Sequence, residues 1–220
     1  MFDFSSLTPY LPMLRSAIFL TLEFTLFSTV LGFIWGTLLS LIKVSRFRLL
    51  AWLGRAYTSF FRGTPLLVQL MLIYFATPQL TGQAIVPTPL QAGVLTFGLN
   101  SAAYISESIR GGILSVDKGQ WEAAMALGVP KTKMMIDIIF PQAFKNILPS
   151  LVNESIALLK DSSLVTIIAV GDVMRWAQLV QTKTFRAFEP FIVAALVYYV
   201  LVMILTFIGN RLERRARVSD

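Results

Sequence analysis

Long apolar segments alternate with short polar segments along this chain. The first apolar block covers residues 16–42 and contains one charged residue, Glu23, and further mostly apolar blocks cover about 60–80, 88–110, 146–171 and 189–210. A helix rises about 1.5 Å per residue, so roughly 20 apolar residues cross the ~30 Å hydrocarbon core of a bilayer. The pattern therefore predicts an all-α membrane protein with about five transmembrane helices, forming a single domain over residues 1–220.

Two features modify this simple pattern. The fourth block is interrupted by the adjacent charges Lys160 and Asp161, so we expect a broken span there. The segment 111–145 is polar and amphipathic, with too many charges to insert into lipid. We therefore expect 111–145 to form a cytoplasmic loop rather than a sixth span.

Composition and charge agree with a membrane location. The chain is 55% hydrophobic and only 14% charged, whereas soluble domains carry about 25% charged residues. The net charge of +7 comes from Lys and Arg residues that lie between the apolar blocks, mainly in 43–62, in 110–145 and in the C-terminal tail. This arrangement favours a topology signal over a nucleic-acid surface, and it predicts that these segments face the cytoplasm. With five spans, the N-terminus then lies outside and the C-terminus inside.

The chain contains no cysteine and no histidine. Disulfides, thiolate nucleophiles, imidazole bases and the usual zinc ligands are therefore excluded. The sequence also contains no GxxxxGK[ST] phosphate loop, so this chain cannot bind ATP through such a loop. We therefore expect a partner subunit to bind ATP and Mg. We expect no catalytic residue, no metal site and no cofactor bound by this chain.

The stretch Gln120–Pro141, QWEAAMALGVPKTKMMIDIIFP, carries the strongest local signal. Good helix formers predict a short helix from Gln120 to Leu127 that ends at Gly128, and Pro130 is placed to open a second helix. An apolar helix face outside the bilayer favours a protein partner that covers it. The alternative is an amphipathic helix that lies on the lipid headgroups.

This stretch resembles the EAA loop of ABC-importer permeases. The matching positions are Glu122, Ala123, Ala124, Gly128, Ile138 and Pro141, with Phe140 in place of the usual leucine. The resemblance implies that the loop forms a coupling helix, which fits a groove in a separate ATP-binding subunit.

Three further segments narrow the family. FFRGTPLLVQL (60–70), NSAAYISESIRGGI (100–113) and LLKDSSL (158–164) are similar to segments of polar amino acid permeases of the histidine, arginine, glutamine and glutamate type. The resemblance implies the ABC type I importer permease fold in a bacterial cytoplasmic (inner) membrane. It also implies an ATP-binding subunit dimer, an identical or homologous permease subunit and an extracytoplasmic amino-acid-binding protein as partners, besides membrane lipid.

Polar residues within apolar spans are the candidate substrate contacts, because a charged or polar side chain in lipid is costly unless it faces protein or water. An exposed helix start after Arg62 also attracts a carboxylate. With the family motifs, these arguments predict a substrate site formed by Gly63, Thr64, Gln69, Asn100, Glu107, Lys160, Asp161 and Ser162.

The same residues also have purely structural interpretations, which involve no substrate. Glu107 and Arg110 stand three residues apart and can form a helix-end ion pair. Gln69 and Asn100 can link neighbouring helices by hydrogen bonds. The junction at Gly63 can be an ordinary loop-to-helix transition.

The sequence thus favours the membrane subunit of an ATP-driven importer of polar, and more specifically basic, amino acids. One alternative is an ion-coupled secondary transporter or channel, in which the ionisable residues form the ion pathway. Another is a membrane-embedded enzyme that uses Glu107 and Asp161 as an acid–base pair. The lack of histidine and of a metal-ligand cluster argues against the enzyme.

Overall fold

The computed structural model describes residues 3–217, which form helices and connecting turns and contain no strand. In chain order the elements are the 3-10 helix η1 (Phe4–Tyr10), α1 (Leu11–Lys43), α2 (Arg48–Gly63), α3 (Leu66–Met71), the π-helix η2 (Leu72–Ala76), α4 (Thr77–Leu80), α5 (Pro89–Leu114), α6 (Lys118–Ala126), α7 (Lys131–Lys133), the π-helix η3 (Met134–Ile139), α8 (Phe140–Asp161), the 3-10 helix η4 (Ser162–Ile168), α9 (Val173–Thr184) and α10 (Phe188–Arg217). The predicted all-α class is confirmed.

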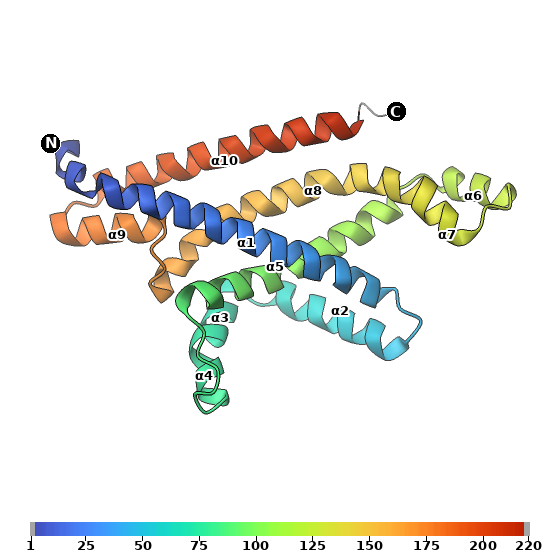
Figure 1. Ribbon diagram of the computed structural model, residues 1–220, viewed down its shortest axis with the longest axis horizontal. Coiled ribbons are helices and arrows are strands. Elements are labelled where there is room, and N and C mark those ends of the chain that lie inside the picture. Colours follow the sequence, from blue (N-terminus) through green and yellow to red (C-terminus); the bar gives the residue numbers. More distant parts are fainter. Residues whose placement is uncertain (1–2, 218–220) are drawn as a thin grey trace.

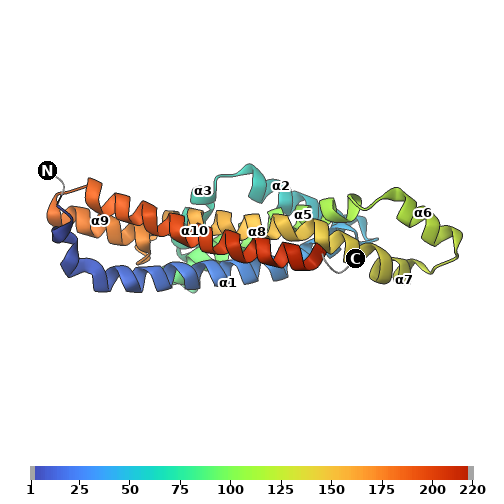
Figure 2. The same cartoon turned by 90° about the horizontal axis from the view of Figure 1, so that it is seen from above.

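The long helices form an elongated bundle with a different small element at each end (Figure 1). Helix α1 packs along α5, α5 packs against α8, and α10 packs on both α8 and α9. The helices α6 and α7 lie at one end of the bundle, whereas α9 and the N-terminal helix η1 lie at the other end (Figures 1 and 2). The segment α3–η2–α4 projects sideways from the bundle (Figure 1).

Small residues bring α1 and α5 close together. A Cβ atom added to Gly32 would lie 2.9 Å from Ser101 Cβ, and one added to Gly36 would lie 2.8 Å from Ile105 Cγ2. Small residues four positions apart let two helix backbones approach each other, which is how helices associate in lipid. The α1–α5 pair therefore forms the central seam of the fold.

Three apolar clusters follow one another along the bundle. The middle cluster includes Phe24 of α1 and Phe97 of α5, whose rings meet edge to face at 5.0 Å between centroids. At the α9 end, Trp176 is buried and its Nε1 donates to the Tyr10 carbonyl at 2.9 Å. At the opposite end, α6 packs on η3, and buried residues of α6, η3 and α8, Ala124 among them, form the third cluster.

Each π-helix ends two residues before a proline. The η2 segment precedes Pro78, and η3 precedes Pro141. Because proline has no N–H and its ring clashes with the carbonyl four residues back, an ordinary α-turn is unfavourable there. The wider turn accommodates the proline and lets the chain continue as α4 and α8 without a break.

The region of the predicted second span differs from the expectation. We expected a basic cytoplasmic segment over 43–62 and a span near 60–80, but a regular helix, α2, already begins at Arg48. It is followed by a bend of 107° between Arg48–Gly63 and Leu66–Leu80. Pro65 explains the break, because it disfavours helical geometry at Thr64, which is extended.

Helices α1 and α10 contain the predicted segments 16–42 and 189–210, α5 overlaps 88–110 from Pro89 onward, and α8 with η4 covers 146–171 only as far as Ile168. The expected interruption of the fourth span coincides with the end of α8 at Asp161 and the start of η4. Helix α9 was not predicted at all. It follows a buried N-cap, Asp172, whose carboxylate accepts from the backbone N–H groups of Met174 and Arg175.

The long helices differ in their apolar composition. Within the described residues, Phe4–Lys43 and Phe188–Ala216 are long and apolar enough to cross a membrane, and the bent pair adds a third if it is one span. Helices α5 and α8 are long but carry charged residues such as Glu107 and Lys160. The number of about five spans therefore stays a prediction.

Two adjacent glycines at the end of α5 test this packing. A Cβ at Gly112 would lie 2.2 Å from Ile147 Cγ1 of α8, whereas a Cβ at Gly111 would meet nothing within 4 Å. We expect Gly112→Ala to destabilise the subunit by about 1–3 kcal/mol through overpacking. Gly111→Ala should be neutral or slightly stabilising, because alanine favours a helix. Thermal unfolding of both variants in detergent checks this, and equal midpoints would contradict the α5–α8 contact.

Candidate functional site

The predicted helix–turn–helix is present at one end of the bundle. Helix α6 begins after Asp117, whose carboxylate accepts from the Gly119 N–H at 2.7 Å. At its end, Gly128 has a φ of +68°, its N–H donates to the Met125 carbonyl, and the Val129 N–H donates to the Ala124 carbonyl, both at 3.0 Å. This pair of bonds is the Schellman motif, in which glycine favours the left-handed position. The loop therefore has a defined shape that depends on Gly128.

Helix α6 turns a single face toward the bundle. Ala124 is 2% exposed within the cluster at this end, which includes Met134 and Ile139. On the other side Glu122 and Ala123 are exposed, and Met125 and Leu127 are 57% and 82% exposed. Large apolar side chains at a loop tip beyond the long helices call for a partner surface.

A hydrogen-bond network joins three of the predicted substrate residues at the bend after α2. Gln69 Nε2 lies 2.9 Å from the Phe61 carbonyl and 2.8 Å from Thr64 Oγ1, and Asn100 Nδ2 donates to the Phe61 carbonyl at 3.0 Å and to Gln69 Oε1 at 2.9 Å. The network thus links α3 and α5 to the end of α2. Gln69 and Asn100 have the linking role that the sequence left open, and Gly63 stands exposed beside them.

Glu107 lies in a separate cluster of charges. One carboxylate oxygen pairs with Lys43 Nζ of α1, and the other accepts from Arg110 Nε at 2.8 Å. The ion pair with Arg110 is the alternative that the spacing suggested, whereas Lys43 was not anticipated. Its aliphatic stem passes Gly54 of α2, where an added Cβ would lie 2.8 Å from Lys43 Cγ. Two cations therefore neutralise Glu107 in this structure.

The third group of predicted residues lies where α8 ends. Lys160 and Asp161 are exposed, and Asp161 forms no hydrogen bond or ion pair within the described part of the chain. Ser162 is buried and its hydroxyl donates to the Leu159 carbonyl at 2.7 Å. Asp161 thus remains available to a ligand, whereas Ser162 supports the turn into η4.

Sequence reasoning missed Glu154 on the same helix. It stands seven residues before Asp161, nearly two helical turns, so both carboxylates lie on one face of α8. Glu154 is partly buried near the hydroxyl of Ser101 on α5, and it lies within electrostatic range of Asp161. It also lines a cavity of about 220 Å³ between α1, α5 and α8. The seven-residue spacing was the signal available in the sequence.

The predicted substrate residues therefore form three groups instead of one. The bend network holds Thr64, Gln69 and Asn100, the charge cluster holds Glu107, and the end of α8 holds the remaining polar residues. The apolar tip of the α6 loop lies at the end of the bundle (Figure 1). These features indicate a helical membrane protein whose α6 loop exposes an apolar tip at one end of the bundle.

The chain belongs to the family described as the binding-protein-dependent transport system inner membrane component, which matches residues 10–218. It is 51% identical over 218 residues to the arginine transport system permease protein ArtQ of Bacillus subtilis, with 99% of each chain covered. It is 50% identical over 200 residues to a putative glutamine transport system permease protein, GlnP, of Rickettsia bellii, with 91% of each chain covered. The suspected family is thereby confirmed.

Solved structures agree with this assignment. The chain matches a crystal structure of an amino acid ABC transporter with histidines at a TM-score of 0.93 and 39% identity, covering 98% of this chain and 99% of the other. An inward-facing MetNI methionine ABC transporter matches at a TM-score of 0.78 and 19% identity, covering 94% of this chain and 98% of the other, which shows the fold alone. The predicted ABC importer permease fold is confirmed.

Proposed function

We propose that the chain is the membrane-spanning subunit of an ATP-driven importer that carries polar amino acids, basic ones in particular, into the cytoplasm. The observation that supports this most is the α6 loop, in which Gly128 holds exposed apolar residues at the end of the bundle. A separate ATP-binding subunit docks there through Glu122, Ala123 and their neighbours. That partner binds ATP and Mg and performs the hydrolysis, so this chain is not an enzyme.

The acidic face of α8 supports a basic substrate. Asp161 forms no hydrogen bond or ion pair within the described residues, and Glu154 shares its helix face. Two carboxylates about 10 Å apart suit a ligand with a cationic side chain and a cationic α-amino group. Glu107 is a weaker candidate, because Lys43 and Arg110 neutralise it.

The other predicted residues have supporting roles in this proposal. Thr64, Gln69 and Asn100 hold the bend beside the pathway, and Gly63 leaves room there, since a Cβ at this position would meet nothing within 4 Å. Lys160 balances the charge of Asp161. Similarity to permeases named for arginine and glutamine transport supports an amino acid substrate.

The proposed assembly places two permease subunits, identical or homologous, side by side in a bacterial inner membrane. The N-terminus lies outside and the C-terminus in the cytoplasm, as the distribution of Lys and Arg indicates. An extracytoplasmic binding protein delivers the amino acid at the α9 end. Closure of the ATP-binding subunits then opens the spans outward, and hydrolysis returns them to an inward-open state.

Reconstituted uptake tests the proposal. Proteoliposomes that contain the permease, its ATP-binding subunit and its binding protein should accumulate arginine only when ATP is present on the side of the ATP-binding subunit. Liposomes with the permease alone and an imposed proton or sodium gradient are the control. Accumulation driven by the gradient without the ATP-binding subunit would identify an ion-coupled transporter instead.

A further inference from the structure

A cavity of about 520 Å³ lies where α1 ends, between α1, α2 and α5. Its charged lining consists of Lys43, Arg55, Arg110 and Glu107. Three cations thus face one carboxylate, and that carboxylate already pairs with Lys43 and Arg110. The cavity therefore has an excess of positive charge.

Arg55 is the cation of this cavity that forms no ion pair with Glu107. It is exposed and forms no hydrogen bond or ion pair within the described residues. It also lines a second, adjoining cavity of about 270 Å³ together with Ser59, Arg62 and the same carboxylate, Glu107. Arg62 itself stacks over the Tyr104 ring at 5.3 Å. An arginine presents several N–H donors in a planar fork that matches phosphate oxygens, so Arg55 is free to bind an anion.

Arg55 belongs to a basic stripe on α2. Arg48, Arg55 and Arg62 are seven residues apart, nearly two helical turns, so they share one helix face. The opposite exposed face carries apolar residues, such as Leu53 at 48% and Phe60 at 52% exposure. Such a helix is suited to a membrane boundary, with basic residues near headgroups and apolar residues in lipid.

The depth of the cavity and its remaining lining point to lipid. The apolar stretch Phe4–Lys43 ends at Lys43, and we therefore place the cavity at the level where hydrocarbon gives way to headgroups. Leu41, Val44 and Leu114 line it and are 61%, 75% and 69% exposed. Cations at headgroup depth beside exposed aliphatic side chains complement an anionic headgroup with its acyl chains.

We propose that this cavity binds the phosphate headgroup of an anionic phospholipid in the leaflet next to Lys43. Arg55 contacts the phosphate directly, and Arg110 offers the guanidinium donors that Glu107 does not use. Glu107 holds Lys43 and Arg110 in place. Basic pockets between transmembrane helices commonly bind such headgroups. A basic amino acid is a poor occupant, because it would bring net positive charge to walls that are already positive.

The test compares two arginines of α2 in the complete permease–ATPase complex. Arg55→Gln removes a cation that lines the cavity, and Arg48→Gln removes one that lies on the same stripe but does not line it. The retention of phosphatidylglycerol relative to phosphatidylcholine is measured by native mass spectrometry. We expect Arg55→Gln to lower this ratio by about fivefold or more, and Arg48→Gln to lower it much less. Arg110→Gln carries the same expectation as Arg55→Gln, so the proposal does not depend on one variant folding.

Two competitors distinguish the sources of the anion. Millimolar inorganic phosphate and millimolar arginine are each added to the wild-type complex with phosphatidylglycerol bound. Retention in both cases supports the lipid assignment. Displacement by phosphate would identify a site for free phosphate, and displacement by arginine would identify a substrate site. Either displacement, or equal loss in the Arg55 and Arg48 variants, would overturn the proposal.

Discussion

Asp161→Asn is expected to reduce the uptake of a cationic amino acid by about tenfold to a hundredfold. A hydrogen bond to a charged group contributes about 1.5–3 kcal/mol, and each 1.4 kcal/mol corresponds to about a factor of ten. Asp161 is exposed at the end of α8 and has no hydrogen bond or ion pair within the described residues. The substitution should therefore affect the ligand and leave the fold of the subunit intact.

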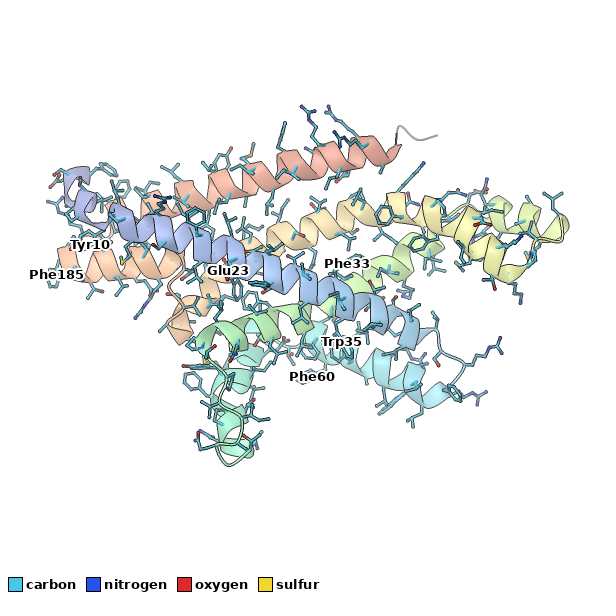
Figure 3. The ribbon with its side chains drawn as sticks, in the orientation of Figure 1. Tyr10, Glu23, Phe33, Trp35, Phe60 and Phe185 are labelled. Carbon is cyan, nitrogen blue, oxygen red and sulfur yellow. The ribbon has the colours of Figure 1, made fainter. Side chains whose placement is uncertain are left out.

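A matched control is available on α1. Glu23 is an exposed carboxylate near the middle of that helix (Figure 3). Glu23→Gln removes the same charge from a membrane-spanning helix, and we expect little change in uptake. Radiolabelled arginine and glutamine are compared in proteoliposomes for both variants. Equal uptake of arginine by the wild type and the Asp161 variant would remove Asp161 from the proposed substrate pathway.

Glu107→Gln should behave differently from Asp161→Asn. Lys43 has a side chain only 6% exposed and depends on Glu107 for neutralisation. Leaving a buried cation without its partner is destabilising. We therefore expect Glu107→Gln to lower the midpoint of thermal unfolding. Any loss of uptake should be proportional to the loss of folded subunit.

Gly128→Val is expected to lower ATP-driven transport by about tenfold or more. A side chain at a φ of +68° costs about 1–2 kcal/mol, and a β-branched one costs more, so the Schellman motif at the end of α6 would open. No heavy atom lies within 4 Å of the missing Cβ, so the effect is one of backbone conformation and not of steric contact. The exposed apolar tip at Met125 and Leu127 would lose its orientation toward the partner.

Gly111→Val is the control for this prediction. Gly111 also has open space around its missing Cβ, but it lies within α5 and has no positive φ. The rate of transport by the Gly111→Val variant should stay close to that of the wild type. The measured quantities are the rates of uptake and of ATP hydrolysis in the reconstituted complex. Gly128→Val should retain hydrolysis but lose uptake, whereas a constant ratio of the two rates would argue against a coupling role for the loop.

Local sequence rules predicted the shape of the α6 loop well. The end of α6 at Gly128 and the start of the next helix after Pro130 follow from glycine and proline preferences that act within a few residues. The break after Asp161 was also visible, because two adjacent charges interrupt an apolar run. These features depend on neighbours in the sequence and need no knowledge of the fold.

The parts that the sequence did not predict depend on tertiary packing. Lys43 and Glu107 are 64 positions apart, and they meet because α1 and α5 pack closely where Gly54 of α2 leaves room for the lysine stem. The basic segment 43–62 was expected only to face the cytoplasm, although the seven-residue spacing of Arg48, Arg55 and Arg62 is a helical spacing. Helix α9 is short and mixed in composition, and it is fixed by contacts with α10 and α1.

Cysteine accessibility at Leu127 tests whether a separate ATP-binding subunit holds the α6 loop at the cytoplasmic side. The chain contains no cysteine, so Leu127→Cys creates a single labelling site at a position that is 82% exposed. A membrane-impermeant maleimide should label it in inside-out vesicles stripped of the ATP-binding subunit, and adding that subunit back should protect it. Labelling in intact cells, from the outer side, would contradict a cytoplasmic α6 loop.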